Sequence, residues 1–180
     1  MAVRPVVKIG SKTLLTPSEP IQQLTLELKQ TVIQDMLDTM KAEDGAGLAA
    51  PQIGVNRRIM IFGVEENPRY PDAEVVPMTI LINPSFEPIG DEKEEGWEGC
   101  LSIPGYRGVV SRYKSIKYRG YSEKGEEIVR EVSDFHARVF QHEYDHLDGI
   151  LYIHRIEDMR YFGLTEELQK SGMIPRNEES

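Results

Sequence analysis

The sequence is poor in the features that mark secreted, membrane-spanning and nucleic-acid-binding proteins. Cys100 is its only cysteine, so no internal disulfide can form. No apolar run approaches the roughly 20 residues that span a bilayer. The first twenty residues hold only short apolar pairs, so we expect no secretory signal. No acid precedes Glu19, but this segment suits the fold better than a very short organellar presequence. These absences predict a protein of a reducing compartment, the cytoplasm.

Basic residues are also few relative to acidic ones. The 180 residues include 21 lysines and arginines against 30 aspartates and glutamates, which gives a formal net charge of −9. Neutralising phosphates needs a clustered basic surface, so this balance argues against direct nucleic-acid binding. The composition is otherwise that of a globular chain. Because we find no internal repeat and no linker, we expect one domain over residues 1–180, with a flexible tail at 171–180.

Histidine is scarce, with four in the chain, yet two of them fall within one short stretch. The segment Gln141–Gly149 contains His142, Glu143 and His146 as a His-Glu-x-x-His pattern, and the residues before it have helical periodicity. Residues four apart lie on one face of a helix, so both imidazoles can reach a single metal ion. Glu143 between them can reach a water molecule at that ion and serve as a general base.

The pattern alone does not establish a metal site. Two hydrogen-bonded histidines on a half-buried helix would fit it about equally well. A catalytic metal usually has three protein ligands and one open position, so a third ligand must lie elsewhere. Cys100 is the best candidate, because a glycine precedes it and Pro104-Gly105 follow, an unusual context for a core cysteine. A thiolate with two imidazoles suits Zn²⁺ and Fe²⁺ alike.

A second unusual stretch, Gly45–Gln52, is rich in glycine and alanine. Small residues let a backbone approach a ligand or a packed helix closely, and a tight turn between a helix and a strand explains them equally well. The stretch lacks the lysine and the glycine spacing of a phosphate-binding loop. Gln52 is the one side chain in it that can donate a hydrogen bond to a polarised oxygen.

Hydrophobic periodicity predicts a helix over residues 25–41, followed by a chain made mainly of strands. We expect these strands at 58–62, at 79–89 with an interruption at Asn83-Pro84, and at 106–111, 115–121 and 128–132. The remaining predictions are a loop at 63–78, a charged turn at 91–95, an extended segment at 150–156 and an amphipathic helix within 157–170.

Three separated stretches together resemble the three motifs of the peptide deformylase family. They are Gly45–Gln52, Glu98-Gly99-Cys100-Leu101-Ser102 and Gln141–Gly149, in the family's order and at similar separations. The resemblance implies an α+β fold, with antiparallel β-sheets packed around the central helix that carries the histidines. It also implies a metal-dependent hydrolase that removes the N-formyl group from the N-terminal methionine of newly synthesised proteins and releases formate.

The resemblance implies a metal site with a general base. Cys100, His142 and His146 match the family's metal ligands, and Glu143 matches its general acid and base. The family's usual ion is Fe²⁺, one per chain, and Zn²⁺, Ni²⁺ or Co²⁺ can replace it.

The resemblance also implies groups that contact the substrate. Gln52 and the backbone N–H of Leu101 match the donors that stabilise the oxyanion. Ala46, Gly47 and Gly99 match backbone positions that pair with the peptide as an added strand, a common mode of peptide recognition.

Helical geometry adds a prediction about the pocket for the methionine side chain. Phe135, Arg138 and Val139 lie one or two turns before His142, on or near its face. We expect Phe135 and Val139 to form apolar wall, and Arg138 to lay its stem there with its charge at the rim. Ordinary helix packing explains the same positions equally well.

The C-terminal segment departs from some relatives, which carry a basic helix that docks on the ribosome. Residues 156–180 here contain three basic and six acidic side chains, a poor match for ribosomal RNA. We therefore expect N-formylmethionyl nascent peptides as partners, with at most transient proximity to the ribosome. No membrane association is expected.

Two other interpretations stay open on the sequence. A zinc peptidase would use the same histidine pattern, although it needs neither Cys100 nor the Gly45–Gln52 stretch, and cleavage of internal peptide bonds would identify it. A catalytically inactive relative would bind peptides without turnover. A purely structural metal site, however, has no use for Glu143 and usually closes its fourth position.

Overall fold

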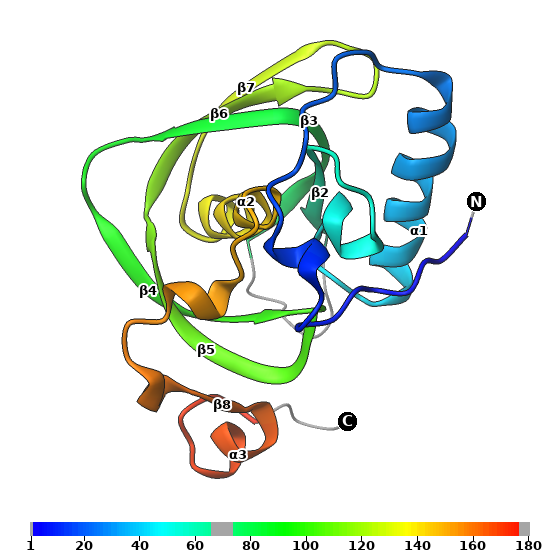
Figure 1. Cartoon of the computed structure of the whole chain (residues 1–180). Coiled ribbons are helices and arrows are strands. Elements are labelled where there is room, and N and C mark those ends of the chain that lie inside the picture. Colours follow the sequence, from blue (N-terminus) through cyan, green and yellow to red (C-terminus); the bar gives the residue numbers. More distant parts are fainter. Residues whose placement is uncertain (1, 66–73, 177–180) are drawn as a thin grey trace.

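A computed structural model describes residues 2–65 and 74–176 of the chain (Figure 1). Half of the loop expected at 63–78, residues 66–73, lies outside these ranges, as do residues 177–180 of the expected tail. Of its described residues, 63–64 and 76–78 belong to strands rather than to a loop. Residues 171–176 are described, and the backbone of Met173 and Ile174 donates hydrogen bonds to the carbonyl of Leu168.

The described residues form three α-helices and eight strands. The helices are α1 (Gln34–Ala42), which continues a π-helical stretch at Leu28–Ile33, α2 (Asp134–Leu147) and α3 (Thr165–Lys170). The strands are β1 (Gly47–Ala49), β2 (Ile59–Val64), β3 (Val76–Pro88), β4 (Lys93–Cys100), β5 (Ile103–Tyr113), β6 (Ser115–Tyr121), β7 (Glu127–Ser133) and β8 (Phe162–Leu164). Short 3₁₀ turns occur at Lys12–Leu15, Ala50–Ile53, Tyr152–Arg155 and Met159–Tyr161.

Within the described ranges, the strands make two antiparallel sheets. One has five strands in the order β1-β2-β3-β6-β7, and the other has three in the order β4-β5-β8. Figure 1 shows α2 enclosed by the strands, with α1 on one flank and β8 with α3 at the far end of the smaller sheet. This is the α+β arrangement that the sequence predicts. Strands β1 and β4 each lie at the edge of their sheet, so each has one side without a strand partner among the described strands.

The central helix is held by its apolar face. Ala137, Phe140 and Leu147 are fully buried and pack with residues of the five-stranded sheet. The ring of Phe140 stacks on Tyr118 of β6, with 4.5 Å between centroids. Removing such side chains from water stabilises the fold by about 1.5–3 kcal/mol each. The same packing turns the opposite face of α2, which carries His142 and His146, away from that sheet.

Most of the predicted elements are confirmed, and the exceptions depend on contacts distant in sequence. The helix at 25–41 and the strands are present, and β3 shifts register between Ile82 and Ser85, at the expected interruption. Residues 93–95, predicted as a turn, belong to β4, because they continue its antiparallel pairing with β5.

The C-terminal part differs more from the prediction. Tyr152–Arg155 is a 3₁₀ turn rather than an extended segment. Within 157–170, Phe162–Leu164 forms β8, which pairs with β5, and the ring of Phe162 stacks on Tyr106 at 5.3 Å. The predicted helix is confirmed only at Thr165–Lys170, which forms α3. A strand added to a distant edge leaves no periodic signal in its own sequence, which explains why β8 was not predicted.

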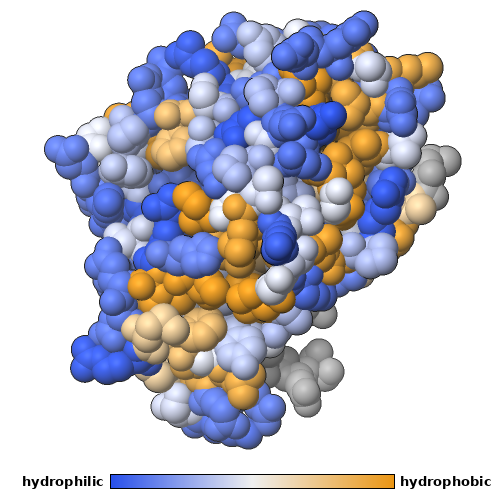
Figure 2. Space-filling model, viewed as in Figure 1, coloured by the Kyte–Doolittle hydropathy of each residue, from blue (hydrophilic) through white to orange (hydrophobic). Residues whose placement is uncertain are grey.

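The surface in the view of Figure 1 is mostly hydrophilic, with apolar atoms gathered above the C-terminal segment (Figure 2). Leu164 of β8 is exposed and pairs with Tyr106 of β5. Among the described helices, none is long and apolar enough to cross a membrane.

Gly149 ends the central helix against the N-terminal segment. Its φ of +73° lies in the left-handed region, and a Cβ added there would lie 2.6 Å from the carbonyl oxygen of Leu15. Gly125 has a similar φ of +80°, but a Cβ there would meet nothing within 4 Å. An alanine at Gly125 therefore measures only the cost of a left-handed backbone, whereas an alanine at Gly149 adds the cost of a clash with Leu15.

We predict that Gly125→Ala lowers the free energy of unfolding by roughly 1–2 kcal/mol, the cost of a left-handed alanine. Gly149→Ala should lower it by a further 1–3 kcal/mol or so, because the N-terminal segment must also move. Urea unfolding followed by circular dichroism measures both. Equal losses in the two variants would contradict the tight packing around Gly149.

Candidate metal centre

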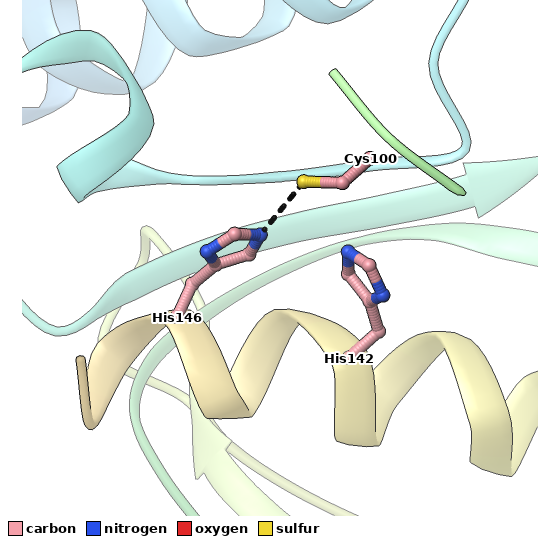
Figure 3. A group of neighbouring side chains, drawn as sticks. All are labelled: Cys100, His142 and His146. Atoms are coloured by element: carbon pink, nitrogen blue, oxygen red, sulfur yellow. Dashed lines mark hydrogen bonds between the residues drawn. The ribbon is translucent and has the colours of Figure 1, made fainter. Parts of the chain in front are cut away.

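Three side chains that the sequence singles out converge at one point. His142 and His146 project from the same face of α2, and Cys100 faces them from the end of β4 (Figure 3). Their ligand atoms all lie within 4.8 Å of one another. Cys100 Sγ is 3.3 Å from Nε2 of His146. The local sequence explains this, because the helical spacing aligns the histidines and the end of β4 brings the thiol opposite them.

The three residues fit a divalent metal ion. In a tetrahedral site with ordinary Zn–S and Zn–N bond lengths, neighbouring ligand atoms lie about 3.3–3.6 Å apart. The separation of Cys100 and His146 falls in this range. The three ligand atoms lie within 4.8 Å of one another, so binding one ion draws them together by about 1 Å at most. One thiolate with two imidazoles leaves a fourth position open in a tetrahedral site, which is the arrangement of catalytic rather than structural sites.

A buried glutamate, Glu98, fixes the orientation of His142. Its Oε1 accepts hydrogen bonds from His142 Nδ1 at 2.8 Å and from Arg112 Nη2 at 2.9 Å. Its Oε2 accepts from Arg112 Nε at 3.0 Å and from Arg138 Nη1 at 2.8 Å. Burial alone would raise the pKa of Glu98, but the hydrogen bonds from His142 and Arg112 outweigh it and hold that pKa well below its usual range. The ionised carboxylate requires His142 to donate through Nδ1, which leaves Nε2 as the metal-binding nitrogen.

The same network continues to Asp145, one turn further along α2. Arg112 donates from Nη1 to Asp145 of α2, and Arg155 donates to both oxygens of Asp145. Arg112 and Asp145 are buried, so each charge depends on the other for compensation. Arg112 therefore connects β5 to α2 through Asp145 and to β4 through Glu98.

The surroundings of Cys100 favour its thiolate form. Burial alone would raise the pKa of its thiol. The positive charge of His146 and hydrogen bonds with both histidines outweigh this and hold the pKa well below the ordinary value. A deprotonated sulfur is the form that binds a metal ion.

Glu143 lies buried beside the ligands. Burial raises its pKa to about 7; the charges of His142 and His146 oppose this rise, while those of Cys100 and Glu98 add to it. Its Oε2 has no hydrogen-bond partner among the residues that the structure describes. A carboxyl group that titrates near neutral pH is suited to take up and return a proton.

Gly47 of β1 packs directly against this carboxyl group. A Cβ added to Gly47 would lie 2.8 Å from Cδ of Glu143, closer than real side chains approach. The glycine in the small-residue stretch is therefore required for the backbone to pass beside Glu143. Of the two explanations that the sequence left open, close approach applies at this position.

Gln52 is placed between the small-residue stretch and the cysteine. Its Oε1 accepts a hydrogen bond from the backbone N–H of Ala49 at 2.9 Å, which fixes the direction of the amide. Its Nε2 donates to Ser102 Oγ at 3.1 Å and points a second N–H at Cys100 Sγ, 3.6 Å away. The amide of Leu101 directly follows Cys100, so both donors lie next to the thiolate.

The candidate peptide-pairing residues lie at the two free edges. Gly47 begins edge strand β1 and Ala46 directly precedes it; the carbonyl of Ala46 accepts a hydrogen bond from the N–H of Gly63 in β2. Gly99 is in edge strand β4, and a Cβ on it would collide with the guanidinium of Arg107. Both edges flank the three ligands.

The three candidate pocket residues on α2 differ in placement. Phe135 is partly exposed and Val139 is buried. The expectation that the charge of Arg138 lies at the rim is wrong, because its guanidinium turns inward to Glu98 and to backbone carbonyls. The reason is Gly96 of β4, whose missing side chain leaves the space that this guanidinium fills.

Sequence reasoning missed Glu98, Arg112 and Ser102 as parts of the site. Glu98 and Ser102 are the first and last residues of the motif that contains Cys100, but the sequence alone assigns them no role. A signal for Arg112 does exist. It follows Val110 at the period of two that marks the inward face of β5, and an arginine on an inward face needs a buried acid.

Comparison with known proteins agrees with this geometry. The sequence profile of the family described as Polypeptide deformylase matches residues 3–161. The chain is 54% identical to Peptide deformylase 2 of Ralstonia nicotianae over 166 residues, which cover 92% of this chain and 94% of the relative. It is 55% identical to Peptide deformylase 1 of Nitrosomonas europaea, with the same coverage of both chains.

A solved structure is similar over most of the chain. It is the Met-Ala-Ser-bound class I type b peptide deformylase of Acinetobacter baumannii, which matches with a TM-score of 0.81 at 37% identity. The match covers 86% of this chain and 99% of the other. The likeness therefore extends to the arrangement of both sheets around the central helix.

We predict that Cys100→Ser abolishes tight metal binding, because a serine hydroxyl stays protonated and is a poor ligand. The wild-type protein loaded with Co²⁺ should show a sulfur-to-metal charge-transfer absorption, and the variant should not. Equilibrium dialysis measures the loss of affinity directly. Undiminished Co²⁺ binding by a folded Cys100→Ser protein would show that the ion lies elsewhere.

Proposed function

The chain belongs to the polypeptide deformylase family, and from this premise we propose that Cys100, His142 and His146 hold a catalytic metal ion beside Glu143. The protein is a metal-dependent hydrolase that removes the N-formyl group from nascent peptides. The observation that carries the assignment of residues is the convergence of three ligand atoms within 4.8 Å. Glu143 lies buried directly beside them.

We assign Fe²⁺ as the resident ion, one per chain, with Zn²⁺, Ni²⁺ or Co²⁺ able to replace it. The donor set of Cys100, His142 and His146 accepts all four. When bound, the ion lowers the pKa of water and polarises the formyl oxygen. Glu98 supports this by keeping His142 in the tautomer that exposes Nε2.

Glu143 moves the proton. In its ionised form it takes a proton from the attacking water as the new C–O bond forms. It then delivers that proton to the amine nitrogen as the C–N bond breaks, so formate and a free amino terminus are released. Its pKa of about 7 makes both transfers feasible near neutral pH.

Gln52 and the Leu101 amide stabilise the negative charge that develops on the formyl oxygen. The Gln52 amide is already fixed by Ala49 and Ser102, so it needs little rearrangement to donate. The Leu101 N–H is fixed by its position next to Cys100. Loss of one donor of this kind typically lowers the rate by about 10²–10³.

The peptide adds as a strand between the two free sheet edges. Ala46 and Gly47 of one edge and Gly99 of the other supply backbone groups for pairing. The methionine side chain lies against Phe135, Val139 and the stem of Arg138. A related enzyme has been solved with Met-Ala-Ser bound, which supports this class of ligand.

The cellular setting follows from the substrate. Residues 1–180 act as one catalytic domain in the cytoplasm, where nascent formyl-methionyl chains emerge. Contact with the ribosome is transient, since residues 156–180 carry more acidic than basic side chains. Direct binding to nucleic acid or membrane has no part in this proposal.

The decisive assay is release of formate from formyl-Met-Ala-Ser by protein purified without oxygen and loaded with Fe²⁺. The isosteric variant Glu143→Gln should lose at least about 10² in kcat, since it cannot accept a proton. For the wild type, kcat/KM should rise with pH as Glu143 ionises, because only the ionised carboxylate accepts the proton. Burial raises the pKa of Glu143 to about 7 and a bound cation lowers it, so the rise should be centred at or below about pH 7. Tight peptide binding without formate release, from folded and metal-loaded protein, would instead indicate a catalytically inactive relative.

We predict that Gly47→Ala lowers kcat by about 10²-fold or more, because its Cβ displaces the carboxyl group of Glu143. Gly163→Ala is the matched control, since a Cβ there meets Leu168 at an ordinary 3.7 Å. The control should keep wild-type activity. A Gly47→Ala enzyme with normal kcat would show that Glu143 does not depend on this contact.

A further inference from the structure

We propose that Arg138 is a positioning residue that holds the metal ligand His142 in place through Glu98. Gly96 is required for this, because the guanidinium of Arg138 occupies the space that a side chain at position 96 would fill. This inference rests on the proposed metal site. It gives the charged end of the arginine a role in addition to the pocket wall that its stem forms.

The contacts of Arg138 show a side chain fixed at its charged end. Its Nη1 donates to Glu98 Oε2 at 2.8 Å and to the carbonyl oxygen of Val110 at 2.9 Å. Its Nη2 donates to the carbonyl oxygen of Glu94 at 2.6 Å. One guanidinium therefore joins α2 to both β4 and β5, on the side of the helix that carries His142.

Glu98 needs this arginine to keep its direction. Arg112 reaches both carboxylate oxygens from one side, while Arg138 reaches Oε2 and His142 reaches Oε1. Without Arg138, Oε2 loses one of its two hydrogen-bond donors. A buried carboxylate oxygen that lacks a donor is unfavourable, so the Glu98 side chain rotates toward other donors. Any such turn moves Oε1 away from Nδ1 of His142. The imidazole then loses the contact that fixes its tautomer and its plane.

Gly96 makes the arrangement possible. A Cβ built on Gly96 would lie 2.8 Å from Cζ of Arg138 and 3.0 Å from its Nε and Nη2. The end of an arginine can usually move aside at little cost, but here it is tied by hydrogen bonds to Glu98, Val110 and Glu94. Even an alanine at 96 must break some of them. The two positions therefore depend on each other, although one is on β4 and the other on α2.

Arg155 provides a control, because it bonds to the same helix through Asp145 rather than to Glu98. It donates to Asp145, at the opposite end of Arg112 from Glu98, and its side chain is 44% exposed. Arg155→Met removes a charge and hydrogen bonds of the same kind as Arg138→Met. It should affect stability without affecting the hydrogen bond between Glu98 and His142.

The experiment measures how fast Co²⁺ leaves the loaded protein when an excess of chelator is added. The decay of the sulfur-to-metal absorption reports the release. Arg138→Met and Gly96→Ala should each release the ion about 10–100-fold faster than the wild type, the usual effect of losing a group that orients a ligand. Arg138→Lys, which keeps one donor, should fall between. Arg155→Met should release Co²⁺ at the wild-type rate.

The double variant tests the coupling. In an Arg138→Met background, Gly96→Ala has no guanidinium to displace, so the double variant should release Co²⁺ no faster than Arg138→Met alone. Additive effects would overturn the role given to Gly96. Kinetics on formyl-Met-Ala-Ser under saturating Co²⁺ should show a lower kcat for Arg138→Met with little change in KM.

Failure of the proposed metal site and failure of the positioning role give different results. Absence of the sulfur-to-metal absorption in the wild type would refute the proposed metal site itself. A wild-type site with unchanged Co²⁺ release from Arg138→Met, or a raised KM alone, would refute positioning and leave Arg138 with a role in the pocket wall only. If Arg138→Met does not fold, Arg138→Lys and Gly96→Ala carry the same test, and normal Co²⁺ release from both would refute the proposal.

Discussion

A buried carboxylate whose acceptor positions are filled connects the metal-binding helix to the smaller sheet. Glu98 accepts hydrogen bonds from Arg112, Arg138 and His142, and it stands two residues before the cysteine of the same site. Leaving such a buried charge without its partner typically costs about 3–5 kcal/mol, so Glu98 keeps its hydrogen bonds as long as the protein is folded. The orientation of His142 therefore depends on a network that spans β4, β5 and α2.

The rest of the site is arranged around this fixed point. The apolar face of α2 packs on the five-stranded sheet through residues such as Phe140, which directs the two histidines toward β4. Gly47 then brings the edge of the larger sheet against Glu143. Burial of Glu143 raises its pKa to about 7, so the packing that closes the site also prepares its proton-transfer group. The proposed chemistry needs all three features at once.

The sequence predicts the parts of this site that depend on local spacing. The interval between His142 and His146 places both on one helical face, and alternation of apolar residues predicts most strands. It does not predict β8, which is fixed by pairing with distant β5, nor the inward turn of Arg138, which depends on the absence of a side chain at Gly96. Both are decided by tertiary contacts between segments far apart in the chain.

The measurement that tests the central claim most directly is anomalous diffraction at the iron edge, from crystals of protein prepared without oxygen and loaded with Fe²⁺. We predict one peak within about 2.0–2.4 Å of Cys100 Sγ, His142 Nε2 and a ring nitrogen of His146, with no fourth protein ligand. Glu98 should remain bonded to His142 Nδ1. A peak elsewhere, or a fourth protein atom that closes the site, would contradict an open metal centre positioned by the buried carboxylate.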